Sequence, residues 1–229
     1  TFEKMHSAYR SFGNTLAAIY SSSVKSDVFF AKARKFDSCV SRAMFADQLP
    51  EKIYENLIEA IHSRLPAYYR YLELRKEILG LDELHVYDTA QPLVGESEKV
   101  YDFDESRNIL VEGLSALGKS YIEDLKGFFD GRAIDVYETP GKTSGAYAWG
   151  TYGTHPYMLL NWSGKLDDVF TFAHEAGHCM HSYYSNKNQT FLNSHYPIFL
   201  AEIASTVNEN ILLRAMLKKC DTSSREGLI

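Results

Sequence analysis

Two histidines lie four residues apart, at positions 174 and 178, in a stretch whose apolar residues recur every three or four positions. That recurrence predicts a helix, which we expect to begin at about residue 166. On a helix, residues four apart are separated by ~6 Å along the axis and point to the same side. The rings of His174 and His178 can therefore reach one metal ion together, each with a nitrogen ~2.1 Å from zinc.

Glu175 follows the first histidine directly and is rotated by ~100° from it around the helix axis. We expect its carboxylate to lie beside a bound ion without binding it, where it can act as a base toward water. This His-Glu-x-x-His pattern is typical of zinc metalloproteases. A catalytic zinc ion takes three protein ligands and keeps one position for water, so a third ligand is needed.

The sequence offers two kinds of third ligand. His181 shares the histidine face, but it lies ~10.5 Å along the axis from His174, so we expect it to support the site or contact substrate. Glu202 and Glu209 are seven residues apart on a further helix predicted at 198–218, with Glu202 as the ligand and Glu209 as an acceptor for an imidazole N–H. The residues expected to pack this helix against the first one are Leu200, Ile203, Val207 and Leu212.

Residues 139–162 contain four glycines with aromatic and β-branched residues between them. This composition predicts a small antiparallel ribbon, with strands at 145–149 and 156–162 and a turn at 152–154. Two interpretations remain open: a packed hairpin, or an exposed edge onto which a peptide adds as a strand. The ribbon residues predicted to contact substrate or support the site are Gly145, Tyr147, Gly153 and His155.

The first half of the chain has a helical pattern. Residues 2–45 are expected to be mostly helical, with an interruption at the three serines of 21–23. Residues 52–79 carry one apolar stripe, in which Pro66 predicts a kink or a break.

A second apolar stripe runs from residue 110 to 128, and Asp104 or Ser106 is the predicted N-cap of its helix. Polar residues at 82–103 predict a connector. We therefore expect a mainly α fold with a small antiparallel β ribbon beside the helix of His174. The sequence pattern changes from helical to extended after residue 132. This change divides a helical region, 1–132, from a second region, 133–229.

Composition limits the possible partners and location. The 229 residues have a net charge of −6, which argues against nucleic acid or an anionic membrane as a partner. No apolar run approaches the ~20 residues that span a bilayer. Three widely spaced cysteines, Cys39, Cys179 and Cys220, indicate a reducing cytoplasm, with Cys179 as an ordinary buried thiol. The sequence opens without Met, so we expect a piece of a longer chain.

Three stretches, 141–162, 170–185 and 199–210, resemble in order and spacing the oligoendopeptidase F family, which belongs with the thimet oligopeptidase-like zinc peptidases. Two upstream stretches, 29–38 and 86–94, are similar to it as well. The resemblance implies one zinc ion bound by His174, His178 and Glu202, with Glu175 as the catalytic base. It also implies a largely helical fold around a channel for short peptides, to which 1–132 would contribute.

Members of that family continue past the point that matches residue 229, and they use His and Tyr residues there to bind substrate and stabilise the oxyanion. The expected activity is hydrolysis of internal bonds in short, unfolded oligopeptides. Two alternatives stay open: a peptidyl-dipeptidase or carboxypeptidase with the same ligands, and a non-catalytic zinc- or peptide-binding domain. A structural zinc usually has four protein ligands, often cysteines, whereas Cys179 points away from the ligand face.

Overall fold

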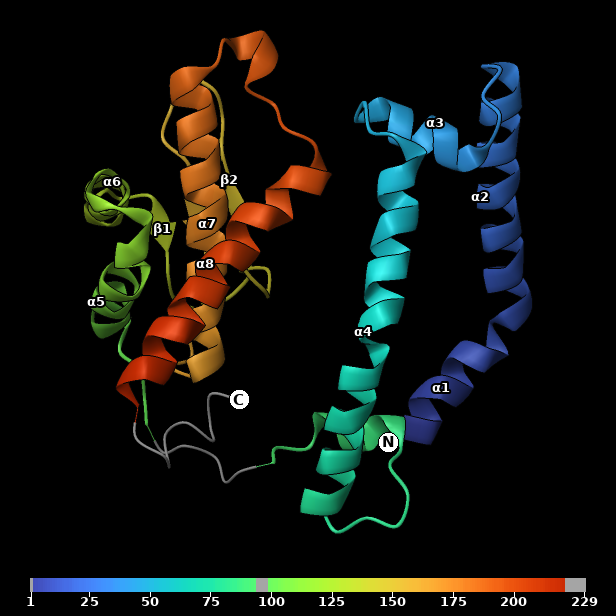
Figure 1. Ribbon diagram of the computed structural model, residues 1–229, viewed down its shortest axis with the longest axis horizontal. Coiled ribbons are helices and arrows are strands. Elements are labelled where there is room, and N and C mark those ends of the chain that lie inside the picture. Colours follow the sequence, from blue (N-terminus) through green and yellow to red (C-terminus); the bar gives the residue numbers. More distant parts are fainter. Residues whose placement is uncertain (1, 94–98, 221–229) are drawn as a thin grey trace. The chain divides into compact units, whose positions relative to one another are not determined.

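The computed structural model describes residues 2–93 and 99–220. The chain forms two compact units, Thr1–Gly95 and Glu96–Ile229, shown in Figure 1 from blue to green and from green to red. The boundary between these units lies at residue 95, and the helices between 103 and 130 belong to the second unit because they pack against the later helices. The division into functional regions at residue 132 stays a prediction. Of the predicted connector at 82–103, residues 94–98 lie outside the described part.

The described part of the N-terminal unit, residues 2–93, contains four α-helices and one short turn of 3₁₀ helix. They are α1 (Phe2–Ser11), α2 (Gly13–Ala33), α3 (Cys39–Ala46), α4 (Glu51–Ile78) and η1 (Val86–Ala90). The predicted interruption at the three serines is wrong, because α2 continues through them and the break lies at Phe12. The Ser22 hydroxyl donates to the Ala18 carbonyl one turn back, which satisfies it inside the helix. Helix α4 also continues through Pro66 without a break.

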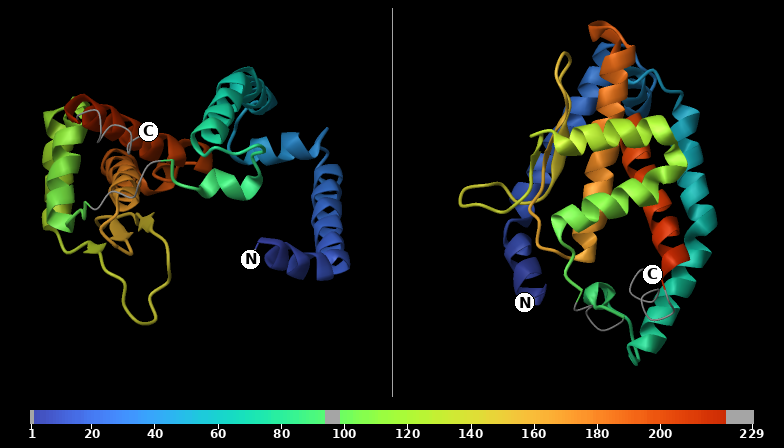
Figure 2. Two further views of the ribbon diagram at one scale, coloured as in Figure 1. Left: turned by 90° about the horizontal axis from the view of Figure 1, so that it is seen from below. Right: turned by 90° about the vertical axis from the view of Figure 1, so that its left-hand side faces the viewer.

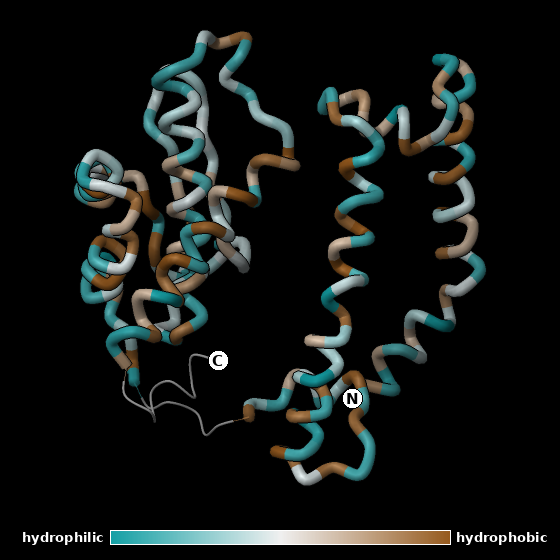
Figure 3. Tube along the Cα trace, viewed as in Figure 1, coloured by the Kyte–Doolittle hydropathy of each residue, from teal (hydrophilic) through white to brown (hydrophobic). Residues whose placement is uncertain are grey.

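Few side chains are buried in the N-terminal unit. Large apolar residues of α2 and α4 are exposed, and Figure 3 shows them as brown segments along both helices. Arg75 on α4 is buried, and its guanidinium donates to the Tyr71 hydroxyl and to the carbonyl groups of Asp88 and Gln91. One arginine therefore attaches η1 and the residue after it to the end of α4.

The C-terminal unit begins with α5 (Phe103–Gly113), η2 (Leu114–Leu117) and α6 (Lys119–Asp130). The apolar stripe predicted as one helix is thus divided, because Gly118 has a φ of 96° that ends the helical backbone and favours glycine. The N-cap of α5 is Asp102, not Asp104 or Ser106. Its carboxylate accepts from the backbone N–H groups of Asp104 and Glu105.

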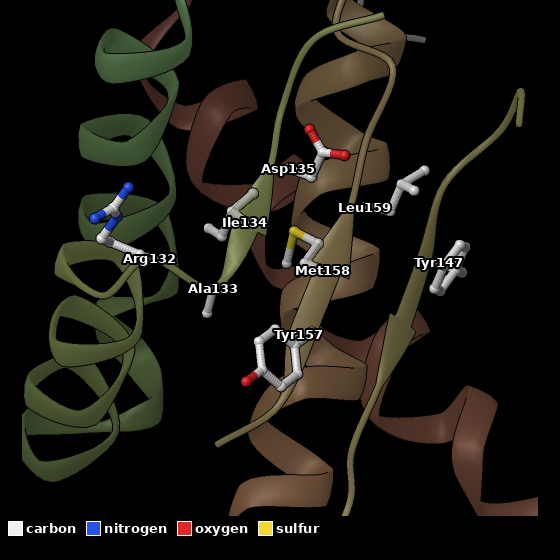
Figure 4. Close-up of a pocket in the computed structure, with 8 residues that line it drawn as sticks. All are labelled: Arg132, Ala133, Ile134, Asp135, Tyr147, Tyr157, Met158 and Leu159. Carbon is white, nitrogen blue, oxygen red and sulfur yellow. The ribbon is translucent and has the colours of Figure 1, made fainter. Parts of the chain in front are cut away.

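The sheet has three short strands, β1 (Ile134–Asp135), β2 (Tyr147–Trp149) and β3 (Tyr157–Leu159). Strands β2 and β3 pair antiparallel, as predicted, with Ala148 opposite Met158. Strand β1 adds to the other side of β3 in parallel, which the sequence did not predict, so β3 lies in the middle (Figure 4). Gly153 has a φ of 85° in the turn between β2 and β3.

Two long helices complete the unit: α7 (Leu166–Asn188) and, after the turn η3 (Phe191–Asn193), α8 (Ile198–Lys219). Helix α8 crosses α7, and the sheet lies beside α7 (Figures 1 and 2). Asp168 fixes the start of α7 by accepting from the backbone N–H groups of Ser163 and Lys165. The predicted mainly α fold with a small sheet beside this helix is confirmed.

Phe172 on α7 is fully buried at the centre of the core. Its ring packs against those of Phe103, Phe129 and Trp162, which come from α5, α6 and the loop before α7. The core therefore holds α7 from several sides. Within the described residues, no helix has the length and apolar character that crossing a membrane requires.

Candidate metal centre

Three side chains from two helices bring their ligand atoms together. The Nε2 atoms of His174 and His178, both on α7, lie 3.1 Å apart. The Oε2 atom of Glu202, on α8, lies 3.3 Å from the first nitrogen and 3.5 Å from the second. In the part of the chain that the structure describes, these three residues form the group that could hold a metal ion.

The three separations suit a tetrahedral zinc ion. At a zinc–ligand bond length of ~2.0–2.1 Å, two corners of a tetrahedron lie about 3.3–3.4 Å apart. The triangle of 3.1, 3.3 and 3.5 Å in the structure brackets that value. Two histidines and one carboxylate, with a fourth position left over, are also a donor set of catalytic zinc sites. The residues present therefore fit the ion.

Each of the three candidate ligands has a hydrogen-bond partner on α8. The His174 Nδ1–H donates to Oε1 of Glu209 over 2.6 Å, because a carboxylate can only accept. That bond leaves Nε2 of a neutral His174 with a free lone pair. The ring of His178 bonds the backbone of Ala201, and the Ser205 hydroxyl donates to Oε2 of Glu202 over 3.1 Å. Partners of this kind orient the ligands of metal sites and fix their tautomers.

Burial favours the form of His178 that binds metals. Desolvation lowers the pKa of His178, and the charge of neighbouring His174 lowers it further, although Glu202 and the Ala201 bond act in the opposite direction. A lowered pKa keeps the imidazole neutral near pH 7, and a neutral imidazole is the form that binds a metal.

Glu175 is buried, with 7% of its surface exposed, and its Oε2 atom has no hydrogen-bond partner among the described residues. Burial raises the pKa of its carboxyl group, the charge of His174 lowers it in part, and Glu202 raises it again. Glu175 lines an open hollow of about 540 Å³ together with His174, Glu209 and Ala146. A carboxylate with a raised pKa in a residue that lines a hollow together with His174 is suited to accept a proton.

His181 lies apart from the three ligand atoms and is not part of their group. Its ring stacks on that of Tyr196 at a centroid distance of 3.7 Å, and its Nδ1 atom is buried without a partner among the described residues. Tyr196 is in turn held by a 2.7 Å hydrogen bond between its hydroxyl and that of Ser182. His181 is thus fixed by packing, one turn beyond His178.

The sequence matches the protein family described as peptidase family M3 over residues 1–227. The chain belongs to peptidase family M3. The oligopeptidase PepF of Bacillus subtilis is 40% identical over 220 residues, which are 96% of this chain and 33% of that protein. The chromosomal oligoendopeptidase F of Lactococcus lactis subsp. cremoris is 44% identical over 229 residues, which are 100% of this chain and 38% of that protein.

Solved structures agree with this assignment to the M3 family. A crystal structure from Chlamydophila abortus, described as a candidate peptidase, matches with a TM-score of 0.82 at 40% identity, over 96% of this chain and 37% of that one. Oligoendopeptidase-F from Enterococcus faecium matches with a TM-score of 0.63 at 29% identity, over 95% of this chain and 31% of that one. The predicted resemblance to oligoendopeptidase F is confirmed, and the chain spans about a third of the length of the curated relatives.

The four predicted ribbon residues of this M3 chain occupy the sheet and its turns. Gly145 precedes β2 with a φ of 90°, and Gly153 lies in the β2–β3 turn. The Tyr147 ring, on β2, is exposed. It lines a hollow of about 550 Å³ on the sheet, together with Arg132 and the six other residues drawn in Figure 4. The ring of His155 packs on Tyr157, and its Nδ1 atom bonds the Pro156 carbonyl.

Of the four residues expected to pack α8, Leu212 is buried as predicted, whereas Leu200, Ile203 and Val207 are exposed, which contradicts the prediction for them. The other buried residues of α8 are the polar Ser205 and Asn208. Glu202 is itself more than half exposed, at 55% of its side chain. The residue that was missed is Asn208, whose side-chain amide donates to the Ala173 carbonyl over 3.1 Å and also bonds the Tyr121 hydroxyl. Only its position one residue before Glu209 hinted at a role.

Proposed function

We propose that this chain carries the zinc centre and the general base of an M3 peptidase that hydrolyses internal bonds of short, unfolded peptides. The observation that supports the proposal most is the triangle of ligand atoms on His174, His178 and Glu202, whose sides of 3.1–3.5 Å suit one tetrahedral zinc ion. Membership of the M3 family and the oligoendopeptidase F relatives support a peptidase.

The roles follow from the contacts. Zinc held by the three ligands would polarise the scissile carbonyl and lower the pKa of a water molecule. Glu175, which lines the hollow beside His174, accepts the proton of the attacking water and passes it to the leaving amine. Glu209 retains the Nδ1 proton of His174, which keeps the Nε2 lone pair directed at the ligand position.

The sheet provides a way to hold the peptide. Strand β2 is an edge of the sheet, because the strand order is β1-β3-β2. Tyr147 and Trp149 on β2 are exposed, and Ala146 just before β2 lines the hollow that contains Glu175. A peptide that adds to this edge bonds through its main chain, so its sequence matters little but it must be extended. This requirement favours short, unfolded substrates.

The compartment proposed for the protein is the cytoplasm. Cys39, Cys179 and Cys220 are free in the structure, which suits a reducing environment. Cys179 is fully buried, and burial raises the pKa of its thiol, so it is suited to packing and not to chemistry.

The test uses peptides that are blocked at both ends by acetyl and amide groups. Incubated with the zinc-loaded full-length protein, such peptides are expected to be cut at internal bonds, with one zinc ion per chain by elemental analysis. Mass spectrometry of the fragments identifies the bond. If only the unblocked forms of the same peptides are cut, by one or two residues at a time from one end, the protein would be an exopeptidase. Zinc binding with no cleavage of any peptide would indicate a binding domain and contradict the proposal.

A further inference from the structure

At Gly177 the backbones of α7 and α8 approach each other closely. A Cβ atom added at this position would lie 2.7 Å from the Cα atom of Ser205, 2.8 Å from the Ala204 carbonyl oxygen and 2.9 Å from the Ser205 nitrogen. All three neighbours are backbone atoms of α8, so no side-chain rotation could make room. The two helices therefore touch backbone to backbone at a point that only glycine permits.

This contact lies within one helical turn of all three ligand candidates. Gly177 is the residue before His178, and it follows His174 by three positions. Ser205 follows Glu202 by three positions and also donates its hydroxyl to the Glu202 carboxylate. The helix separation at this point consequently sets the distance between Glu202 and the two imidazoles.

A second contact fixes the crossing on the other side of His174. Asn208 is 2% exposed, and its side-chain amide donates to the carbonyl of Ala173, the residue before His174. The same side chain bonds the hydroxyl of Tyr121 from α6, so it cannot rotate away without leaving buried polar groups unpaired. Gly177 thus sets how closely the helices approach, and Asn208 prevents them from sliding.

We propose that Gly177 and Asn208 are positioning residues, which hold α7 and α8 at the separation that brings His174, His178 and Glu202 to zinc-binding distance. The proposal rests on the zinc centre proposed above. Neither residue contacts the ion or the substrate. Both act by placing the ligand atoms, because metal–ligand distances that deviate by more than about 0.2 Å are already significant.

An added methyl group at Gly177 must move α8 away by roughly 0.7 Å, to reach the 3.4 Å at which ordinary van der Waals contact begins. This displacement exceeds the tolerance of the metal–ligand distances. Gly177→Ala is therefore expected to weaken zinc binding by about 10- to 100-fold, the range typical of residues that orient metal ligands. Asn208→Ala removes the second contact without adding volume and is expected to change zinc affinity in the same direction.

The chain supplies two matched controls. Gly113 on α5 also packs tightly against α8, but a Cβ atom there would meet the Cδ1 atom of Leu212 at 2.5 Å, far along α8 from Glu202. Gly113→Ala therefore disturbs the packing of α8 away from the ligands. A Cβ atom at Gly127, within α6, would meet nothing within 4 Å, so Gly127→Ala reports only the change in helix propensity.

The four variants and the wild type are compared as full-length proteins. Circular dichroism checks folding, competition with a chromophoric chelator measures zinc affinity, and visible absorption of the cobalt-substituted protein reports tetrahedral geometry. Gly177→Ala and Asn208→Ala are expected to lose zinc affinity and to change the cobalt spectrum, while both controls retain the wild-type values. Thermal midpoints separate these effects from general destabilisation, which Gly113→Ala also produces.

Folded Gly177→Ala protein with wild-type zinc affinity and cobalt spectrum would overturn the proposal, and so would an equal loss of affinity in Gly113→Ala. If Gly177→Ala does not fold, Asn208→Ala decides: weaker zinc binding with a changed cobalt spectrum supports the proposal, and unchanged values contradict it. A wild-type protein that binds no zinc would refute the proposed function itself, which distinguishes that failure from failure of the positioning role.

Discussion

The Nδ1 atom of His174 lies 2.6 Å from the Oε1 atom of Glu209, so a hydrogen bond from α7 to α8 is formed directly behind a candidate ligand nitrogen. Glu209→Ala removes the acceptor and leaves the His174 ring free to change its tautomer. We expect zinc affinity to fall by about 10- to 100-fold, as for other residues that orient metal ligands. Competition with a chromophoric chelator measures the zinc affinity.

Glu209→Gln is the matched variant, because its amide oxygen can still accept from Nδ1. We expect it to retain more zinc affinity than Glu209→Ala. Equal affinities of the wild type and Glu209→Ala would mean that the hydrogen bond does not orient the ligand.

Glu175→Gln should leave the metal bound and abolish turnover. The amide has nearly the same shape as the carboxylate, but it cannot accept the proton of the attacking water. Because general-base catalysis typically contributes 10²–10⁴-fold, kcat should fall by at least about 100-fold. Peptide cleavage and bound zinc are measured on the same sample. Near-normal cleavage with zinc still present would show that another group acts as the base.

Glu202→Ala should weaken zinc binding far more than His181→Ala. The Glu202 carboxylate completes the triangle of ligand atoms, whereas His181 lies outside it and stacks on Tyr196. We expect a loss of more than about 100-fold for Glu202→Ala, beyond the range for supporting residues. The reverse ranking in a metal titration would require a different ligand set.

The local part of the site could be predicted from the sequence, because the spacing of His174, Glu175 and His178 on one helix depends on helix geometry alone. Glu202 was harder, since it required the relative placement of two helices, and there the family resemblance helped. Asn208 could not be predicted. Helix α8 has apolar residues on several sides, and its buried side is decided by how α7, α5 and η2 pack around it.

The same distinction between local pattern and long-range packing explains where the predicted fold was wrong. Long apolar stripes predicted the helices, but their ends depended on single residues. Gly118 divides what looked like one stripe, whereas α2 continues through the three serines, and one of them, Ser22, donates its hydroxyl to the Ala18 carbonyl one turn back. An extended stretch from Ile134 could be predicted, but the parallel pairing of β1 with β3 could not, because two residues carry no periodicity and the pairing is long-range.

Asp102→Ala should destabilise the C-terminal unit by about 1 kcal/mol, the usual cost of losing an N-cap. Asp102 accepts from two backbone N–H groups at the start of α5, whose Leu110 belongs to the core. Asp102→Asn keeps an acceptor and should cost less. Denaturant unfolding at constant zinc concentration measures the difference. Equal stability of Asp102→Ala and the wild type would show that the cap contributes nothing.

All of the candidate ligands and the residues that support them come from α7 and α8, two α-helices joined by residues 189–197, which include η3. The metal centre is therefore assembled from contacts of low sequence separation, for which chain closure costs little entropy. A nascent chain can form this helical pair as soon as α8 has been synthesised. If the proposed zinc ion binds to the paired helices and not to the unfolded chain, it would stabilise them by mass action, and the yield of folded protein would then depend on the zinc supply.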